Sequence, residues 1–194
     1  IIINKFDSMF DQYEYIAEQI QKNIAEDDLL PEDILVIFPD AYTSKKEYYK
    51  LQDSLLKRSI SSNLAGVTTD RDTFKEKGYI TCSSIYRAKG NESAVVYVVN
   101  ADYCISGPEL IKKRNAIFTA ITRSKAWVCI TGVGDEMEQL MDEINECRSN
   151  NYHLQFKVPT DEQIRKMRRV HRELSHNDHK ARKIIDELKK MITS

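Results

Sequence analysis

The chain has 194 residues, of which 41% are hydrophobic and 30% are charged, enough to bury the core of one globular domain and too apolar for a disordered chain. The longest apolar runs fall far short of the roughly 18 to 20 residues that cross a bilayer, and no signal sequence is present, so we predict a cytoplasmic protein with no membrane partner. A formal net charge of −1 gives no overall attraction to nucleic acid. The four cysteines form no C-x-x-C pair, which favours reduced thiols over a zinc site or a disulfide framework.

The first half of the chain predicts a helix, a buried strand and a second helix. Apolar residues recur at helical spacing over 7–25. The run at 34–38 is continuously apolar and is followed by Pro39, which is typical of a strand buried on both faces of a parallel sheet. A second helix is predicted over 44–57, whereas the polar segment 60–78 predicts a loop.

The second half of the chain alternates strands with helices. Strands are predicted over 79–83, 94–99 and 127–131, and helices over 108–122, with Pro108 in the first turn, and over 135–147. Such alternation predicts an α/β fold with a mostly parallel sheet covered on both faces, an open three-layer domain of RecA-like (P-loop-NTPase-type) or Rossmann-like type.

The end of the chain changes in composition. An edge strand over 152–158 completes the predicted α/β domain, residues 1–158, and residues 159–194 predict a basic helical C-terminal extension. His176 and His179 lie in that extension without further paired ligands, so no metal site is predicted. Because the chain begins with Ile1 rather than methionine, we expect it to be a portion of a longer protein.

Two polar turns that adjoin apolar strands contain the candidate catalytic and binding residues. The first reads Ser84-Ile85-Tyr86-Arg87-Ala88-Lys89-Gly90-Asn91-Glu92, and the second reads Phe118-Thr119-Ala120-Ile121-Thr122-Arg123-Ser124. In the first turn, Lys89 offers a cation, Gly90 allows a ligand to approach closely, and Glu92 can accept hydrogen bonds from a sugar hydroxyl. No G-x-x-x-x-G-K-[ST] loop occurs, so the chain cannot by itself hold nucleotide phosphates in the P-loop manner.

The first turn resembles motif V of superfamily 1 helicases of the UvrD/Rep type, which usually reads T-x-H-x-x-K-G-x-E-F. The resemblance implies that Ser84 and Tyr86, in the places of the Thr and His, contact a single strand together with Lys89. It also implies that Gly90 and Glu92 belong to the ATP site, with Glu92 at the ribose. Tyrosine can stack on a base or bind a phosphate, which preserves the role expected of the histidine.

The second turn resembles motif VI of the same family, typically Y-V-A-x-T-R-A. Phe118 matches the aromatic residue, Ala120 the small one, and Thr122 and Arg123 the T-R pair. In the family this arginine reaches across a cleft to the γ-phosphate, so the resemblance implies that Arg123 is the catalytic residue and also contacts ATP. Each short string recurs by chance in unrelated proteins, but their order, their separation and their strand contexts together favour the helicase interpretation.

The resemblance therefore implies the C-terminal, second RecA-like motor domain of an ATP-dependent DNA helicase or translocase. ATP and Mg²⁺ would be held mainly by a P-loop domain elsewhere in the same parent chain, and this chain alone would not hydrolyse ATP. The implied partners are that P-loop domain and single-stranded or partly duplex nucleic acid, with DNA favoured over RNA.

Some residues depart from the family pattern and keep other interpretations open. Pro39 stands where an arginine usually ends the strand of the D-I-A-V-L-Y-R segment, and Ser93 replaces an aromatic residue after Glu92. One alternative is a degenerate, non-catalytic RecA-like module that binds nucleic acid or protein. Another is an unrelated α/β binding domain whose basic tail engages a partner.

Overall fold

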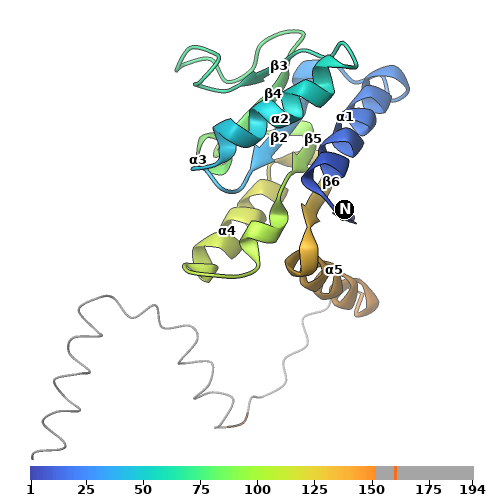
Figure 1. The fold of residues 1–194 in the computed structure, drawn as a ribbon, viewed down its shortest axis with the longest axis vertical. Helices are drawn as coiled ribbons and strands as arrows, with labels where there is room; N and C mark the ends of the chain where they lie inside the picture. The colour runs from blue at the N-terminus through green and yellow to red at the C-terminus, as the bar shows by residue number, and fades with distance from the viewer. Residues whose placement is uncertain (152–159, 161–194) are drawn as a thin grey trace, which may run out of the picture. The chain divides into compact units, whose positions relative to one another are not determined.

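The computed structural model describes residues 1–151 and residue 160 (Figure 1). The predicted edge strand over 152–158 and the predicted helical extension after Pro159 lie outside the described residues, apart from Thr160, and so do His176 and His179.

Six strands within the described part of the chain form one sheet in which every pair of neighbours is parallel. Along the sheet the order is β1-β6-β5-β2-β4-β3. The strands are β1 (Ile2–Phe6), β2 (Ile34–Phe38), β3 (Ser62–Leu64), β4 (Ile80–Ser84), β5 (Ser93–Val98) and β6 (Ser124–Val133). All five residues of the central strand β2 are buried, as its uninterrupted apolar run predicts.

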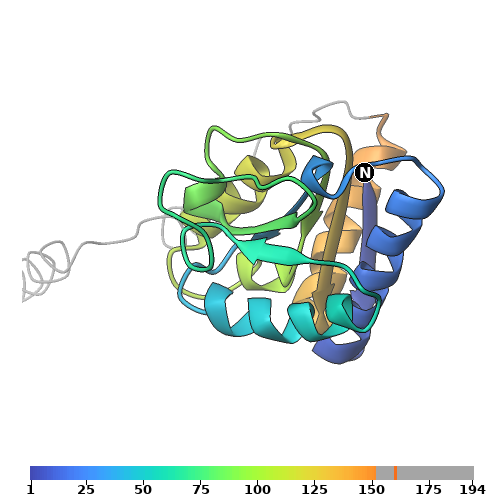
Figure 2. The same cartoon turned by 90° about the horizontal axis from the view of Figure 1, so that it is seen from above.

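Helices cover both faces of this sheet (Figures 1 and 2). One apolar cluster packs α1 (Met9–Ala25) and α2 (Ser44–Leu56) against one face. A second cluster packs α3 (Ile85–Ala88), α4 (Leu110–Ile121) and α5 (Gly134–Ser149) against the other face. Short 3₁₀ turns lie at η1 (Pro31–Asp33) and η2 (Ala101–Cys104). The three-layer α/β fold with a parallel sheet, expected of a RecA-like domain, is confirmed.

Several elements differ from the sequence prediction. The strand β1 was not predicted, because its sequence, Ile-Ile-Asn-Lys-Phe, is neither alternating nor continuously apolar, and it gains its hydrogen bonds only by pairing with β6 far along the chain. Likewise, β3 lies in the segment predicted to be a loop and exists through its pairing with β4. The helix predicted from Pro108 begins instead at Leu110, because Glu109 adopts a left-handed backbone conformation with φ 58° that interrupts helical hydrogen bonding.

A parallel sheet has two chemically different edges. All amino ends of the strands lie at one edge, here called the amino edge, and all carboxyl ends lie at the opposite carboxyl edge. A six-residue strand such as β5 separates the edges by roughly 20 Å. No helix among the described residues is both long and apolar enough to span a membrane.

Candidate nucleotide and nucleic-acid interface

Ser84 and Tyr86 lie at the carboxyl edge. Ser84 is the last residue of β4, and the single-turn helix α3 follows it directly. Buried Ile85 and Ala88 anchor this turn in the core, while the Tyr86 side chain points outward and is 74% exposed. An exposed aromatic ring on a rigidly anchored turn can offer its face to a base at little conformational cost.

A loop interaction that the sequence did not reveal supports this turn. Arg87 donates a hydrogen bond to the carbonyl oxygen of Arg71, and its guanidinium lies against Gly66. Gly66 has φ +73°, and a Cβ atom built there would lie 2.5 Å from Cζ of Arg87. Glycine adopts this backbone conformation without strain, and it lets the Arg87 guanidinium lie close to the loop after β3, which joins that loop to α3.

Lys89 and Gly90 turn the chain from α3 toward the start of β5. Lys89 is exposed at the end of α3, and Gly90 has φ +86°. A Cβ atom at Gly90 would meet nothing within 4 Å, so in this structure the glycine is required by the backbone conformation rather than by crowding. Glu92 follows as an exposed residue immediately before β5, at the amino edge.

Arg123 lies at the same edge, between the end of α4 and the start of β6. Its Nε donates to the carbonyl oxygen of Thr119 at 3.2 Å, and its Nη2 donates to the Thr122 hydroxyl at 3.2 Å. A cation at this position interacts favourably with the negative end of the helix dipole. Within the described residues no carboxylate forms an ion pair with Arg123, so its charge is available to an anion.

The structure brings Glu92 and Arg123 together. The backbone N–H of Ser93 donates to the carbonyl oxygen of Arg123 at 3.0 Å, which fixes the two turns side by side. Lys125 Nζ lies 3.9 Å from Glu92 Oε2, so a second cation adjoins the carboxylate. The predicted site residues thus divide: Glu92 and Arg123 share the amino edge, Ser84 and Tyr86 lie at the carboxyl edge, and Lys89 and Gly90 connect the two.

A pocket of about 240 Å³ opens at the carboxyl edge between the ends of β2 and β5. After β2 the chain continues to β3 on one side of the sheet, whereas after β5 it continues to β6 on the other side. Two neighbouring strands of this kind form a topological switch point, where α/β proteins commonly bind ligands. Pro39 and Asp40 line the pocket from β2, and Asn100 and Asp102 line it from β5. Burial raises the pKa of the Asp102 carboxyl above its usual range.

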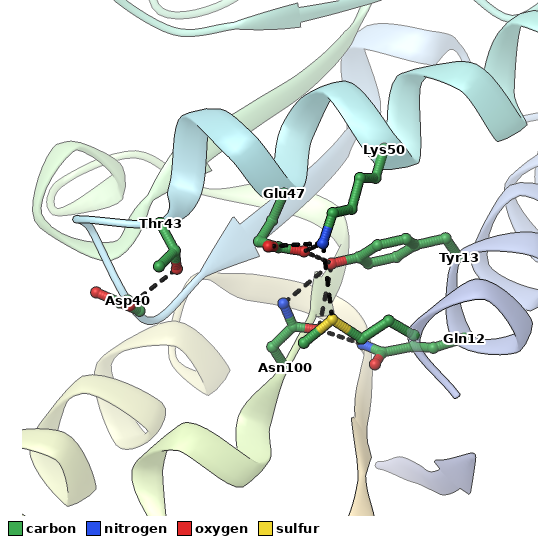
Figure 3. A network of polar contacts seen from close by, with 8 residues as sticks. Gln12, Tyr13, Asp40, Thr43, Glu47, Lys50 and Asn100 are labelled. Carbon is green, nitrogen blue, oxygen red and sulfur yellow. Dashed lines mark hydrogen bonds and ion pairs between the residues drawn. The ribbon is translucent and has the colours of Figure 1, made fainter. Parts of the chain in front are cut away.

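A buried polar network, which the sequence did not reveal, supports the wall of this pocket (Figure 3). The Tyr13 hydroxyl donates to Glu47 Oε2 at 2.6 Å, and Lys50 Nζ lies 3.0 Å from both Glu47 oxygens. Gln12 donates to Asn100 Oδ1 at 3.0 Å. Burial and the adjacent Glu47 raise the pKa of Tyr13 far above its usual range, so Tyr13 remains a neutral donor.

The described residues contain no group of three His, Cys, Asp or Glu side chains that could hold a metal ion. Cys82, Cys104 and Cys129 are buried free thiols, and Cys147 is an exposed one. Burial raises the pKa of Cys104 and Cys129 to about 12, so these thiols stay protonated and unreactive.

Both turns lie within one segment of the chain that matches a known protein family. Residues 79–131 match the family model of the UvrD-like helicase C-terminal domain. This segment runs from the start of β4 into β6 and includes every predicted site residue from Ser84 to Arg123. Over these residues the chain is similar to the UvrD-like helicase C-terminal domain, and the resemblance predicted from its motifs is confirmed.

A solved structure is also similar to this chain. It is the crystal structure of the C-terminal domain of a possible DNA helicase from Lactobacillus plantarum WCFS1, with 21% sequence identity and a TM-score of 0.47. The similarity covers 69% of this chain and 73% of that one. No curated protein matches the sequence significantly.

Proposed function

We propose that this chain is the second motor domain of an ATP-dependent DNA helicase or translocase, and that Arg123 is its arginine finger. The observation that carries the proposal is that the turns of Arg123 and Glu92 lie side by side at one edge of the sheet, inside the segment that matches the helicase family. An unpaired guanidinium suits a phosphoryl oxygen, and a neighbouring carboxylate suits ribose hydroxyls.

In this proposal a P-loop domain of the parent chain faces the amino edge, with ATP and Mg²⁺ held mainly by that domain. ATP·Mg²⁺ supplies the phosphoryl group whose transfer to water releases the energy for movement. Arg123 donates hydrogen bonds to the γ-phosphate oxygens and stabilises the charge that they carry in the transition state. Gly90 shapes the turn that presents Glu92 to the ribose.

The carboxyl edge is proposed to hold the single strand. Tyr86 stacks on a base, and Ser84 and Lys89 contact the backbone. Only the short segment from Tyr86 to Glu92 separates the proposed strand contact from the proposed nucleotide contact. Because Ile85 and Ala88 fix this segment in the core, movement of the domain on the nucleotide would be transmitted to the strand as a rigid-body displacement.

A second candidate function is a non-catalytic interaction module with the same fold. The composition of the carboxyl-edge pocket favours it, because Pro39 stands where the family pattern has an arginine and the neighbouring carboxylate of Asp40 disfavours phosphate binding.

Two variants of the parent protein, each measured in two assays, separate these functions. Under the motor proposal, Arg123→Ala abolishes ATP hydrolysis and leaves single-strand binding intact. Tyr86→Ala, in contrast, mainly weakens single-strand binding. A non-catalytic module predicts that neither variant changes hydrolysis. The 194-residue chain alone should show negligible ATPase activity, and measurable turnover by it would contradict the proposed division of labour.

A further inference from the structure

A groove of about 690 Å³ opens between the start of α1 and the second half of α2. Met9 and Phe10 line it from α1, and Leu56 and Lys57 line it from the end of α2. All of its lining residues lie outside the segment 79–131 that matches the helicase family, and none of them makes a proposed contact with ATP or with the single strand. The proposed motor function therefore leaves this surface without a role.

Three large apolar side chains of this groove are exposed. Phe10 is 63% accessible, Leu56 is 57% accessible and Met9 is 36% accessible. Single exposed apolar residues are normal on a protein surface, but three that line one hollow form a patch of the kind that marks an interaction site. The buried Tyr13 also lines the groove, and its hydroxyl is held by Glu47 at 2.6 Å, so this part of the lining is fixed.

The helix beside this apolar patch is basic. Lys46, Lys50 and Lys57 are separated by four and seven residues, which places all three on one face of α2. Over 44–58 the basic residues outnumber the acidic ones by five to two. Lys46 is exposed and forms no ion pair within the described residues. A surface with this excess of positive charge attracts an acidic partner.

Lys57 can accept a further carboxylate partner. Its ammonium group lies 5.4 Å from the centroid of the Phe10 ring and 3.2 Å from Glu14 Oε1. Arg58 lies 2.9 Å from the other oxygen of Glu14, so two cations share one carboxylate. A partner side chain that packs on the Phe10 ring would therefore lie beside an ammonium group that is only partly neutralised.

The form of the groove favours a helical partner. Side chains of two helices line it, and no sheet edge is available there to an added strand. From Lys50 to Lys57 the helix rises about 10 Å, which matches roughly two turns of a partner helix with apolar residues at i, i+3 or i+4, and i+7. Asp53 lies between these lysines on α2 and also lines the groove, and its carboxylate disfavours the phosphates of a nucleic acid.

We propose that this groove docks a partner protein through an amphipathic helix that carries apolar anchors on one face and Asp or Glu residues beside them. The anchors pack against the three exposed apolar side chains of the groove, and the acidic residues pair with Lys46 and Lys57. Because neither Tyr86 nor Arg123 lines the groove, the domain can hold such a partner without blocking the contacts proposed for the strand and for ATP.

Fluorescence anisotropy tests the groove with the 194-residue chain and a labelled synthetic peptide of about 16 residues, long enough to form a helix. The peptide carries Leu at the anchor positions and Glu beside them, and a second peptide carries Lys in place of every Glu. The acidic peptide should bind, and Phe10→Ala should lower its affinity about tenfold because one buried anchor contact is lost. Ile111→Ala, at an exposed apolar residue on α4, is the matched control and should bind like the wild type.

A charge reversal tests the electrostatic part of the proposal. Lys46→Glu should weaken binding of the acidic peptide and strengthen binding of the lysine peptide, because it inverts the charge beside the apolar patch. Both effects should shrink as the salt concentration rises.

Failure of the acidic peptide to bind, equal affinity of the wild type for the two peptides, or equal affinity of Phe10→Ala and Ile111→Ala for the acidic peptide would overturn the proposal. Two other occupants give their own signatures. Affinity for a labelled single-stranded oligonucleotide that falls in both Phe10→Ala and Lys46→Glu would assign the groove to nucleic acid. Self-association of the wild type in sedimentation that is lost in Phe10→Ala would assign it to a second copy of the chain, and either result would overturn the docking of an acidic helix.

Discussion

Ser93 donates its backbone N–H to the carbonyl oxygen of Arg123 at 3.0 Å, a bond that joins residues thirty positions apart and sets Glu92 beside the guanidinium-bearing turn. Because this bond belongs to the backbone at the start of β5 and β6, the relative position of the two turns does not depend on their exposed side chains. Side-chain substitutions at Glu92, Arg123 or Tyr86 should therefore change function with little change in stability.

Tyr86→Ala should lower the affinity of the parent protein for single-stranded DNA by about tenfold, because it removes one stacking surface. Tyr86→Phe should retain most of the affinity, since the ring supplies the stacking. Fluorescence anisotropy with a labelled oligonucleotide measures both variants. Tyr49→Ala, at a partly exposed tyrosine on α2, serves as a control. Equal affinity of Tyr86→Ala and Tyr49→Ala would remove Tyr86 from the interface.

Gly66→Ala should reduce the free energy of unfolding by about 1 to 2 kcal/mol, because alanine strains the backbone at φ +73° and the flexible end of the Arg87 side chain must shift away from the added methyl group. Gly78→Ala is the matched control: its φ is +83°, but nothing lies within 4 Å of the added atom, so only the backbone strain of about 1 kcal/mol applies. Chemical denaturation measures both variants. If the contact with Arg87 causes the additional loss of stability, Gly66→Ala in an Arg87→Ala background should lower the free energy of unfolding no more than Gly78→Ala does. A cost that stays high would locate the strain elsewhere.

Glu14 on α1 should make stability depend on pH in the acid range. Hydrogen bonds from Ser54, Arg58 and Lys57 lower the pKa of its carboxyl to about 2. A pKa lowered in the folded state contributes stability above about pH 4.3, the unfolded value, and that stability is lost as the pH falls toward 2. The ion pairs are partly exposed, so the contribution is about 1 kcal/mol.

Glu14→Gln should accordingly unfold with a flatter pH dependence between pH 4.5 and 2, as followed by denaturation at several pH values. Glu18→Gln, at an exposed carboxyl whose pKa is lowered chiefly by Lys22, should flatten the profile less than Glu14→Gln does. Parallel profiles for the wild type and Glu14→Gln would show that the network between α1 and α2 contributes no stability.

Local sequence patterns were sufficient for much of this fold. The apolar run of β2 and the amphipathic spacing of α1 and α2 predict those elements, because burial of their side chains determines them. By contrast, β1 and β3 could not be predicted, because both depend on hydrogen bonds to strands distant in sequence.

For the candidate site, the motifs alone identified Tyr86, Glu92 and Arg123. The division of these residues between two edges of the sheet follows from the parallel direction of β4, β5 and β6. What the motifs could not provide was that β5 and β6 are neighbours, which brings the turns of Glu92 and Arg123 together. The roles of Arg87 and of the Glu47 network were equally hidden, since each depends on contacts between separate segments of the chain. The positive φ of Gly66 has no signature in the sequence beyond the glycine itself.

The measurement that tests the central claim most directly is single-turnover ATP hydrolysis by the parent protein carrying Arg123→Ala, with nucleotide binding measured on the same sample. Arg71→Ala, which removes an exposed guanidinium but keeps the carbonyl that Arg87 contacts, is the matched control. The account predicts that Arg123→Ala slows hydrolysis by about 10³-fold or more while ATP still binds, and that Arg71→Ala hydrolyses at the wild-type rate. Hydrolysis by Arg123→Ala within a few fold of the wild-type rate would contradict it.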